Sequence, residues 1–330
     1  MDPTACAAAI AASDADAVIT AAGSFTPAGE NKALVVLSDG GDTDSTNTLD
    51  AAVWIGDEDA NGIGGMFGRN PSTSSLHTFE MGIVFIASNG AGGEKVVFRG
   101  YDDLGQLISF PNADNISGAF AVAAGTTAHI VSAGAVNFAI VWITPDATSP
   151  SGYTAMGTML SSAGTGLNGQ GFSFGAPAAP FVLKQLPAGF DPVNSNFQAT
   201  GLSGEDSNDV VLSWNMTTVA NGDDLMAQHI RVLLDPATGI AMSMAAEGDA
   251  VTVNAETAGN QSGGAIAGLL GDRFIAVYQD NNLGHTDGAD IVGRIVDTRD
   301  AVNPDPIIGD FVQPGGRVLA RRDVLVRSEE

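Results

Sequence analysis

GIVFIAS (82–88) is the stretch of sequence that decides the fold, because its pattern returns three more times. The other copies are FAIVWIT (138–144), VVLSWNM (210–216) and FIAVYQD (274–280). Each copy runs through small or β-branched apolar residues to an aromatic residue, and polar residues follow. The aromatic residues recur at intervals of roughly 60 residues, a period typical of repeat architectures, and they are Phe85, Trp142, Trp214 and Tyr278.

Each copy is followed by a second apolar run of strand length. These second runs are KVVFRGYDDLG (95–105), TAMGTMLSSAG (154–164), AQHIRVLLDPATG (227–239) and IVGRIVDTRD (291–300). Short apolar runs between Gly, Asp, Asn, Ser and Pro clusters predict strands and turns, so we expect an all-β protein. A degenerate fifth copy, AAVWIGDEDANGIGGMFGRN (51–70), has the same order of strand, Trp54, acidic loop and strand.

The repeat favours a particular architecture. A single four-stranded sheet cannot bury both of its faces, whereas sheets stacked in a ring cover each other. We therefore predict a β-propeller of about five four-stranded blades, with the repeated aromatic residue packed between neighbouring blades. Tandem β-sandwiches are the alternative, because short strands with frequent turns fit them too. The predicted divisions are an Ala-rich N-terminal segment (1–24), a propeller-like repeat domain (25–310) and a C-terminal junction or tail (311–330).

Charge and composition exclude several classes of protein. The 330 residues include 38 Asp and Glu but only 13 Lys and Arg, so the net charge is −25. A chain this acidic repels nucleic acid and anionic membrane surfaces. Its single cysteine, Cys6, excludes a disulfide framework and a cysteine-based zinc site. No apolar run reaches the ~20 residues of a membrane span, so we expect no membrane insertion.

The segment AAVWIGDEDANGIGGMFGRN (51–70) resembles tandem repeats of large secreted bacterial proteins that carry calcium-binding RTX nonapeptides. The resemblance extends more weakly over residues 33–300. It implies a propeller-type module, extracellular location and type I secretion. IIGDFVQPGGRVLARRDVLV (307–326) resembles the bridge into such nonapeptides, so we expect the chain to be part of a longer protein. The nonapeptide run GGxGxDxUx itself is not present in the sequence, so its calcium sites do not carry over.

Two acidic loops supply candidate calcium ligands. In DEDANG (57–62), Asp57, Asp59 and Asn61 alternate before a glycine, as in the first half of a calcium loop, although Gly68 stands where the bidentate Glu would be. DNNLGHTDGAD (280–290) offers the second set, which is Asp280, Asp287 and Asp290. We predict Ca²⁺ binding in these loops. The alternative is that they are acidic turn residues facing solvent.

Motifs for catalysis lack their structural context. GFSFG (171–175) places Ser173 in a G-x-S-x-G pattern, but the prolines that follow it argue against the helix of a nucleophile elbow. We therefore predict a non-enzymatic extracellular module with an adhesion, matrix or scaffold role, whose partner is a glycan or a cell-surface or matrix component. A carbohydrate-active enzyme or a lectin built on a propeller is the alternative.

Overall fold

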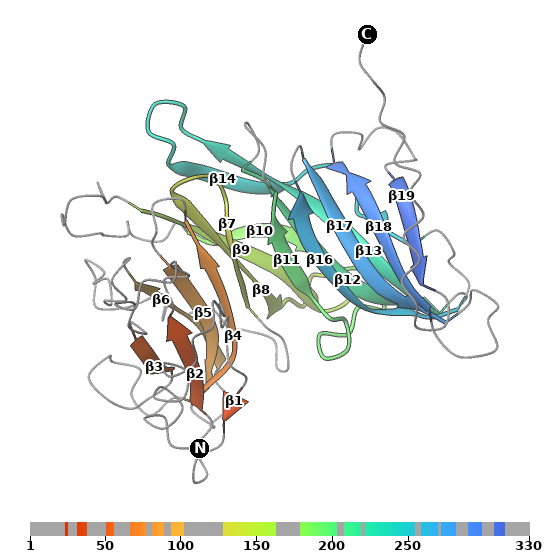
Figure 1. Cartoon of the computed structure of the whole chain (residues 1–330), viewed down its shortest axis with the longest axis horizontal. Helices are drawn as coiled ribbons and strands as arrows, with labels where there is room; N and C mark the ends of the chain where they lie inside the picture. The colour runs from red at the N-terminus through yellow and green to blue at the C-terminus, as the bar shows by residue number, and fades with distance from the viewer. Residues whose placement is uncertain are drawn as a thin grey trace, which may run out of the picture. The chain divides into compact units, whose positions relative to one another are not determined.

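The structure is a computed structural model of the whole chain. It describes residues 24–25, 32–37, 51–55, 67–76, 81–88, 94–101, 128–162, 179–202, 208–218, 222–254, 259–269, 272–281, 290–298 and 307–313. Most of these residues form antiparallel β-strands, which confirms the predicted all-β class (Figure 1). None of them belongs to a helix with the length and hydropathy of a membrane span.

The strands form five sheets, and each sheet uses strands that are consecutive in the chain. The first sheet holds β1 (Ser24–Phe25), β2 (Lys32–Leu37) and β3 (Ala51–Ile55). The second holds β4 (Phe67–Ser75), β5 (Met81–Ser88) and β6 (Glu94–Tyr101). The third holds β7 (His129–Ser132), β8 (Asn137–Pro145), β9 (Tyr153–Ser161) and β10 (Phe181–Gln185).

The fourth and fifth sheets follow the same plan. The fourth holds β11 (Gln198–Gly201), β12 (Val210–Thr218), β13 (Gly222–Leu234), β14 (Ala241–Ala246) and β15 (Val251–Thr252), with β14 and β15 both paired to β13. The fifth holds β16 (Gln261–Leu269), β17 (Arg273–Asp280), β18 (Asp290–Asp297) and β19 (Ile307–Gln313). Within the described residues the sheets therefore have three to five strands, where four had been expected throughout.

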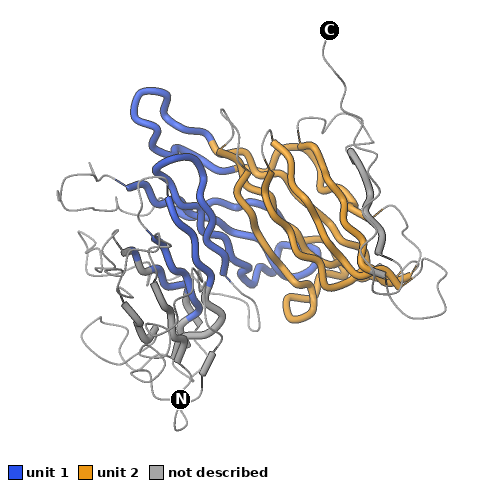
Figure 2. The backbone as a smooth tube through the Cα atoms, in the orientation of Figure 1, with its two compact units in different colours: residues 1–185, 233–244 blue, residues 186–232, 245–330 orange. Residues whose placement is uncertain are grey.

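Two compact units divide the chain (Figure 2). Unit 1 comprises residues 1–185 and 233–244, and unit 2 comprises residues 186–232 and 245–330. The predicted boundary at residue 24 falls in β1, and the one at residue 310 falls in β19. The remainder of the Ala-rich segment, residues 1–23, lies outside the described residues.

The repeated aromatic residue occupies the second strand of four sheets, and the following run of each repeat is the third strand. The register places Phe85 opposite Val97, Trp142 opposite Met156, Trp214 opposite Met226 and Tyr278 opposite Val292. The hairpin at the centre of each repeat is therefore confirmed.

The upstream copy has the predicted order of a strand with Trp54 (β3) followed by a second strand (β4), but these two strands do not pair with each other as in the other copies. Trp54 pairs with Leu34, so β3 ends the first sheet, and the strand after its acidic loop, β4, pairs with β5 in the second sheet. The physical reason is length. Trp54 precedes Phe85 by about half of the ~60-residue repeat period, which leaves no room for a full repeat between them.

In unit 1 the core lies between the second and third sheets, and every second residue of their central strands contributes to it, because successive side chains of a strand point to opposite faces. Its members are Leu76, Val84, Ile86, Val96, Phe98, Ala128, Ile130, Phe138, Ile140, Trp142 and Leu160. The rings of Phe98 and Phe138 meet with centroids 5.9 Å apart and planes tilted by 53°. Gly82 allows this close approach, since a Cβ there would lie 2.5 Å from Ile130 Cδ1.

In unit 2 an equivalent core lies between the fourth and fifth sheets. Its members are Leu202, Val211, Leu225, Ala227, Val253, Phe274, Ala276, Tyr278, Val292 and Val296. β17 shows an alternation of buried and exposed residues. Phe274, Ala276 and Tyr278 are buried, whereas Val277 and Gln279 are exposed. Trp142 and Tyr278 therefore pack between two successive sheets, as predicted for the repeated aromatic residue.

Candidate functional site

Most of the predicted calcium ligands lie outside the described residues. These are Asp57, Asp59, Asn61 and Asp287. Their prediction as ligands therefore stays a prediction.

Asp280, predicted as a calcium ligand in an acidic loop, lies instead at the end of a strand. It is the last residue of β17, its side chain is buried, and Gln261 Nε2 donates a hydrogen bond of 3.2 Å to its Oδ1. Asp290 begins β18 directly opposite Asp280 in the register. The two residues are thus neighbours across a hairpin, and at least one carboxylate oxygen of Asp280 is engaged by a protein donor.

Asp280 belongs to a buried polar chain that connects the fourth and fifth sheets within unit 2. Asn254, which follows β15, accepts a hydrogen bond from Leu225 N at 2.8 Å. Its Nδ2 donates to Asp224 Oδ1 at 2.7 Å and to Gln261 Oε1 at 3.2 Å. Buried carboxylates are costly unless hydrogen-bonded, and here two neutral amides link Asp224 to Asp280. The arrangement holds the two sheets in register.

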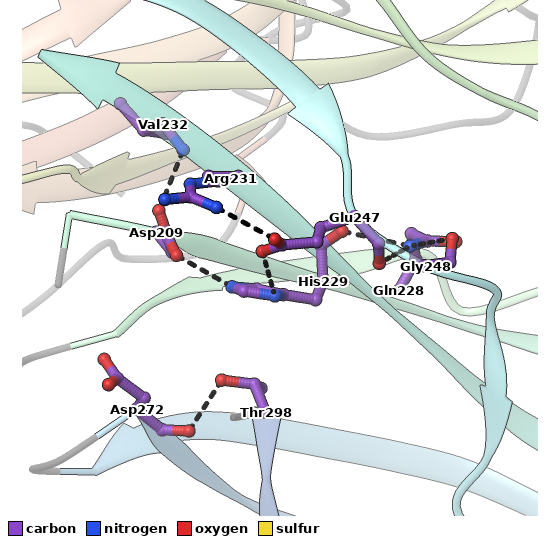
Figure 3. A network of polar contacts seen from close by, with 9 residues as sticks. All are labelled: Asp209, Gln228, His229, Arg231, Val232, Glu247, Gly248, Asp272 and Thr298. Carbon is purple, nitrogen blue, oxygen red and sulfur yellow. Dashed lines mark hydrogen bonds and ion pairs between the residues drawn. The ribbon is translucent and has the colours of Figure 1, made fainter. Parts of the chain in front are cut away.

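A second polar cluster, the imidazole–carboxylate cluster, consists of Asp209, His229, Arg231 and Glu247 (Figure 3). Asp209 directly precedes β12, His229 and Arg231 lie on β13, and Glu247 directly follows β14. The hairpin register of β12 and β13 explains why Asp209 lies beside His229. Val211 pairs with His229 and Val210 with Ile230, so Asp209 comes level with the same part of β13.

The His229 ring lies between two carboxylates. Its Nε2 is 2.9 Å from Asp209 Oδ2, and its Nδ1 is 3.3 Å from Glu247 Oε2. A neutral imidazole carries one N–H, so one of its nitrogens presents a lone pair. Nδ1 is shielded from solvent and has no hydrogen bond of acceptable geometry despite the nearby carboxylate. Whichever nitrogen of the neutral ring carries the proton, the other nitrogen presents its lone pair to a carboxylate, and a cation bound between that nitrogen and its carboxylate removes the conflict.

Further contacts hold both carboxylates in place. Val232 N donates to Asp209 Oδ1 at 2.8 Å, and Arg231 Nη1 donates to Glu247 Oε1 at 3.0 Å. Glu247 N donates to His229 O at 3.0 Å, and Gln228 Nε2 donates to Glu247 O at 3.0 Å. Each acid is thus fixed through one oxygen, while its other oxygen faces the imidazole.

The sequence patterns did not indicate this cluster. His229 stands inside an apolar run of the sequence, and no metal-binding spacing surrounds it. Asp209 and Glu247 are separated from it by ordinary strand and loop residues. The only available signal was the strand pairing itself, because a hairpin register between β12 and β13 places Asp209 beside His229.

Two exposed turns contain carboxyl groups with altered acidity. The hydroxyl of Thr148 donates to Asp146 Oδ1 at 2.7 Å, and that of Thr154 donates to its Oδ2 at 2.7 Å. These hydrogen bonds, and one from the Thr148 amide, lower the pKa of Asp146 because they favour its charged form. The Val193 amide, followed by the Asn194 side chain, lowers the pKa of Asp191 in the same way.

Comparison with known proteins gives structural similarity alone. No family model and no curated protein sequence matches the chain. The sialidase of Trypanosoma rangeli is 11% identical with a TM-score of 0.40, over 76% of this chain and 38% of its own. A protein of unknown function from Dyadobacter fermentans is 13% identical with a TM-score of 0.40, over 86% and 72% of the two chains.

A third similar structure is the GH43 protein BlXynB of Bacillus licheniformis. It is 14% identical with a TM-score of 0.35, over 81% of this chain and 45% of its own. The chain therefore spans about two fifths of the sialidase and less than half of the GH43 protein. Similarity at this level identifies neither an activity nor a substrate for this chain.

Proposed function

We propose that the five sheets are the blades of a propeller-type module. The supporting observation is burial on both faces of a strand. All residues from Asn137 to Ile143 in β8 are buried, and so are all from Val210 to Asn215 in β12. A two-layer sandwich exposes the outer face of each sheet, so its strands alternate between buried and exposed residues. A sheet in a propeller is covered on both faces, which favours a ring over tandem sandwiches.

The proposed role of this module is non-enzymatic binding or scaffolding outside the cell, as part of a longer secreted protein. Its acidic loops bind Ca²⁺ in this proposal, and its partner is a glycan or a surface or matrix component. The net charge of −25 and the resemblance to RTX-associated repeats support this role. So does the use of buried polar groups. Asp224, Asn254 and Asp280 are engaged in holding strands together within unit 2.

A direct test measures binding and hydrolysis on the same preparation. The full chain is applied to a glycan array and to a panel of matrix proteins, with Ca²⁺ and with EDTA, and is assayed for hydrolysis of any glycan that binds. The proposal expects saturable, calcium-dependent binding without turnover. Hydrolysis of a bound glycan would refute the non-enzymatic role in favour of a carbohydrate-active enzyme. Binding that does not depend on calcium would refute the proposal that Ca²⁺ is needed for it.

The calcium part has its own test at the predicted loop. We expect Ca²⁺ to raise the melting temperature of the wild-type chain, and the variant Asp57→Asn/Asp59→Asn to lose most of that rise. Asp191→Asn is the matched control, because Asp191 is an exposed turn carboxylate with protein donors of its own. Equal calcium responses of all three proteins would refute the assignment of these ligands.

A further inference from the structure

We propose that the imidazole–carboxylate cluster binds one divalent transition-metal ion, with Asp209, His229 and Glu247 as its ligands. A nitrogen of His229 and one oxygen of each acid lie within 4.8 Å of one another. All three belong to unit 2. The inference goes beyond the calcium loops of the proposed function, because it concerns other residues and another class of metal.

The separations suit metal coordination. Bonds of ~2.0–2.2 Å from Zn²⁺ to nitrogen and oxygen place two ligand atoms ~2.9–3.5 Å apart for octahedral to tetrahedral angles. The 2.9 Å between His229 Nε2 and Asp209 Oδ2 falls in this range. Glu247 Oε2 lies 3.3 Å from Nδ1, the other nitrogen of the ring, so Glu247 completes the set at Nε2 only after its side chain rotates. That rotation is open to it because the side chain is 41% exposed. Water fills the remaining coordination positions in this arrangement.

The supporting contacts resemble those of a prepared site. Ligating carboxylates in metalloproteins are themselves hydrogen-bonded, and such partners fix their orientation. Here Val232 N holds Asp209 through Oδ1, and the backbone hydrogen bond from Glu247 N to His229 O holds two of the three ligands side by side. The ligand oxygen of Asp209 is therefore oriented before an ion arrives, whereas Glu247 is held beside His229 by its backbone and has only its side chain to turn.

The donor set selects the kind of metal. Ca²⁺ and Mg²⁺ take oxygen ligands, whereas an imidazole suits zinc, copper, iron or nickel. A site with one nitrogen and two carboxylate oxygens therefore favours a transition metal over calcium. Zn²⁺ is the probe of choice because it is stable to oxidation and binds imidazole and carboxylate together.

Arg231 sets a limit on affinity. Its guanidinium already neutralises Glu247 through Oε1, so an incoming cation competes with it for the same carboxylate. Arg231 is 57% exposed at its side chain and is free to move away. Replacing it with glutamine removes the competing charge but leaves the three ligands in place.

The test is calorimetric titration of the EDTA-treated, dialysed full chain with ZnCl₂ in excess CaCl₂, which saturates all-oxygen sites. We expect one equivalent of Zn²⁺ per chain. Glu247→Gln should weaken binding at least ~10-fold, the loss found even when only a supporting group is removed, and His229→Gln should weaken it further. His129→Gln is the control, since His129 is a partly buried strand histidine in unit 1, and it should bind as wild type does.

Three results would overturn the proposal. The first is the absence of saturable binding at one equivalent. The second is equal affinity in wild type, Glu247→Gln and His229→Gln. The third is weaker binding by Arg231→Gln, which should bind Zn²⁺ at least as tightly as wild type does. If His229→Gln fails to fold, Glu247→Gln decides, because its altered side chain is partly exposed and similar in shape.

Discussion

Asn254→Ala is expected to destabilise the protein more than any surface amide substitution. The alanine leaves Leu225 N without its acceptor, and it removes the donor that Asp224 and Gln261 share. A neutral hydrogen bond contributes ~0.5–1.5 kcal/mol and one to a charged group ~1.5–3 kcal/mol, so losing these three contacts should cost about 3–5 kcal/mol. The whole free energy of unfolding of a domain is only ~5–15 kcal/mol.

The assay is urea unfolding followed by tryptophan fluorescence, with the midpoint and the slope compared between variants. Asn260→Ala is the matched control, because Asn260 is an exposed amide whose Oδ1 accepts a long bond of 3.3 Å from Asp223 N. Its substitution should stay within about 0.5 kcal/mol of wild type. If both variants lose the same small amount, the buried amide chain does not hold the sheets together and the reasoning fails.

Two further predictions concern unit 1. Gly82→Val should lower the unfolding free energy by ~1–3 kcal/mol through overpacking, because its Cβ would lie 2.5 Å from Ile130 Cδ1 and 2.8 Å from Phe98 Cε2. Thermal melting checks this, and an unchanged melting temperature would contradict the close packing. Asp146 has a lowered folded-state pKa, so its contribution to stability is present above its unfolded pKa of ~3.9 and is lost as pH falls through the folded value. The melting temperature of Asp146→Asn should therefore fall less between neutral and acid pH than that of wild type. Identical pH dependence of the melting temperature in the two proteins would exclude the effect.

The fold was predictable to the extent that it depends on local pattern. The aromatic residue and the apolar run after it form a hairpin because both have strand periodicity and a polar turn lies between them. Trp54 shows where the pattern stops being sufficient. Its neighbouring residues fit the repeat, yet β3 pairs backward with β2, since pairing depends on which strand is within reach as well as on sequence.

The buried role of Asp280 was within reach of the same reasoning. Phe274, Ala276 and Tyr278 point into the core, and a strict period of two continues to Asp280. The acidic residues after it in the sequence suggested a loop, and that suggestion outweighed the alternation. The partner, Gln261, carries no signal of its own because an amide at the start of a strand is common.

The imidazole–carboxylate cluster was only partly predictable. Asn221-Gly222 is a strong hairpin signal, but a two-residue turn at that pair would place Asp209 opposite Leu234. The observed register, which pairs Thr218 with Gly222, instead brings Asp209 level with Arg231, close to His229. Glu247 cannot be found in this way. Glu247 lies near His229 because β14 pairs with β13 and ends at Ala246, the residue before Glu247. That pairing depends on tertiary packing.

The arrangement of each sheet from consecutive strands has a consequence for how the chain folds. Every described strand pairs with a strand close to it in sequence, and the longest connection between consecutive paired strands is the 19 residues between β9 and β10 (162–180). Folding rates fall as the mean sequence separation of contacts grows, and most all-β proteins are slow for that reason. Here each sheet can form independently, as soon as its own strands are available, and the docking of successive sheets is the later step. The protein should therefore fold in order along its length, with the buried amide chain of unit 2 closing only after both of its sheets exist.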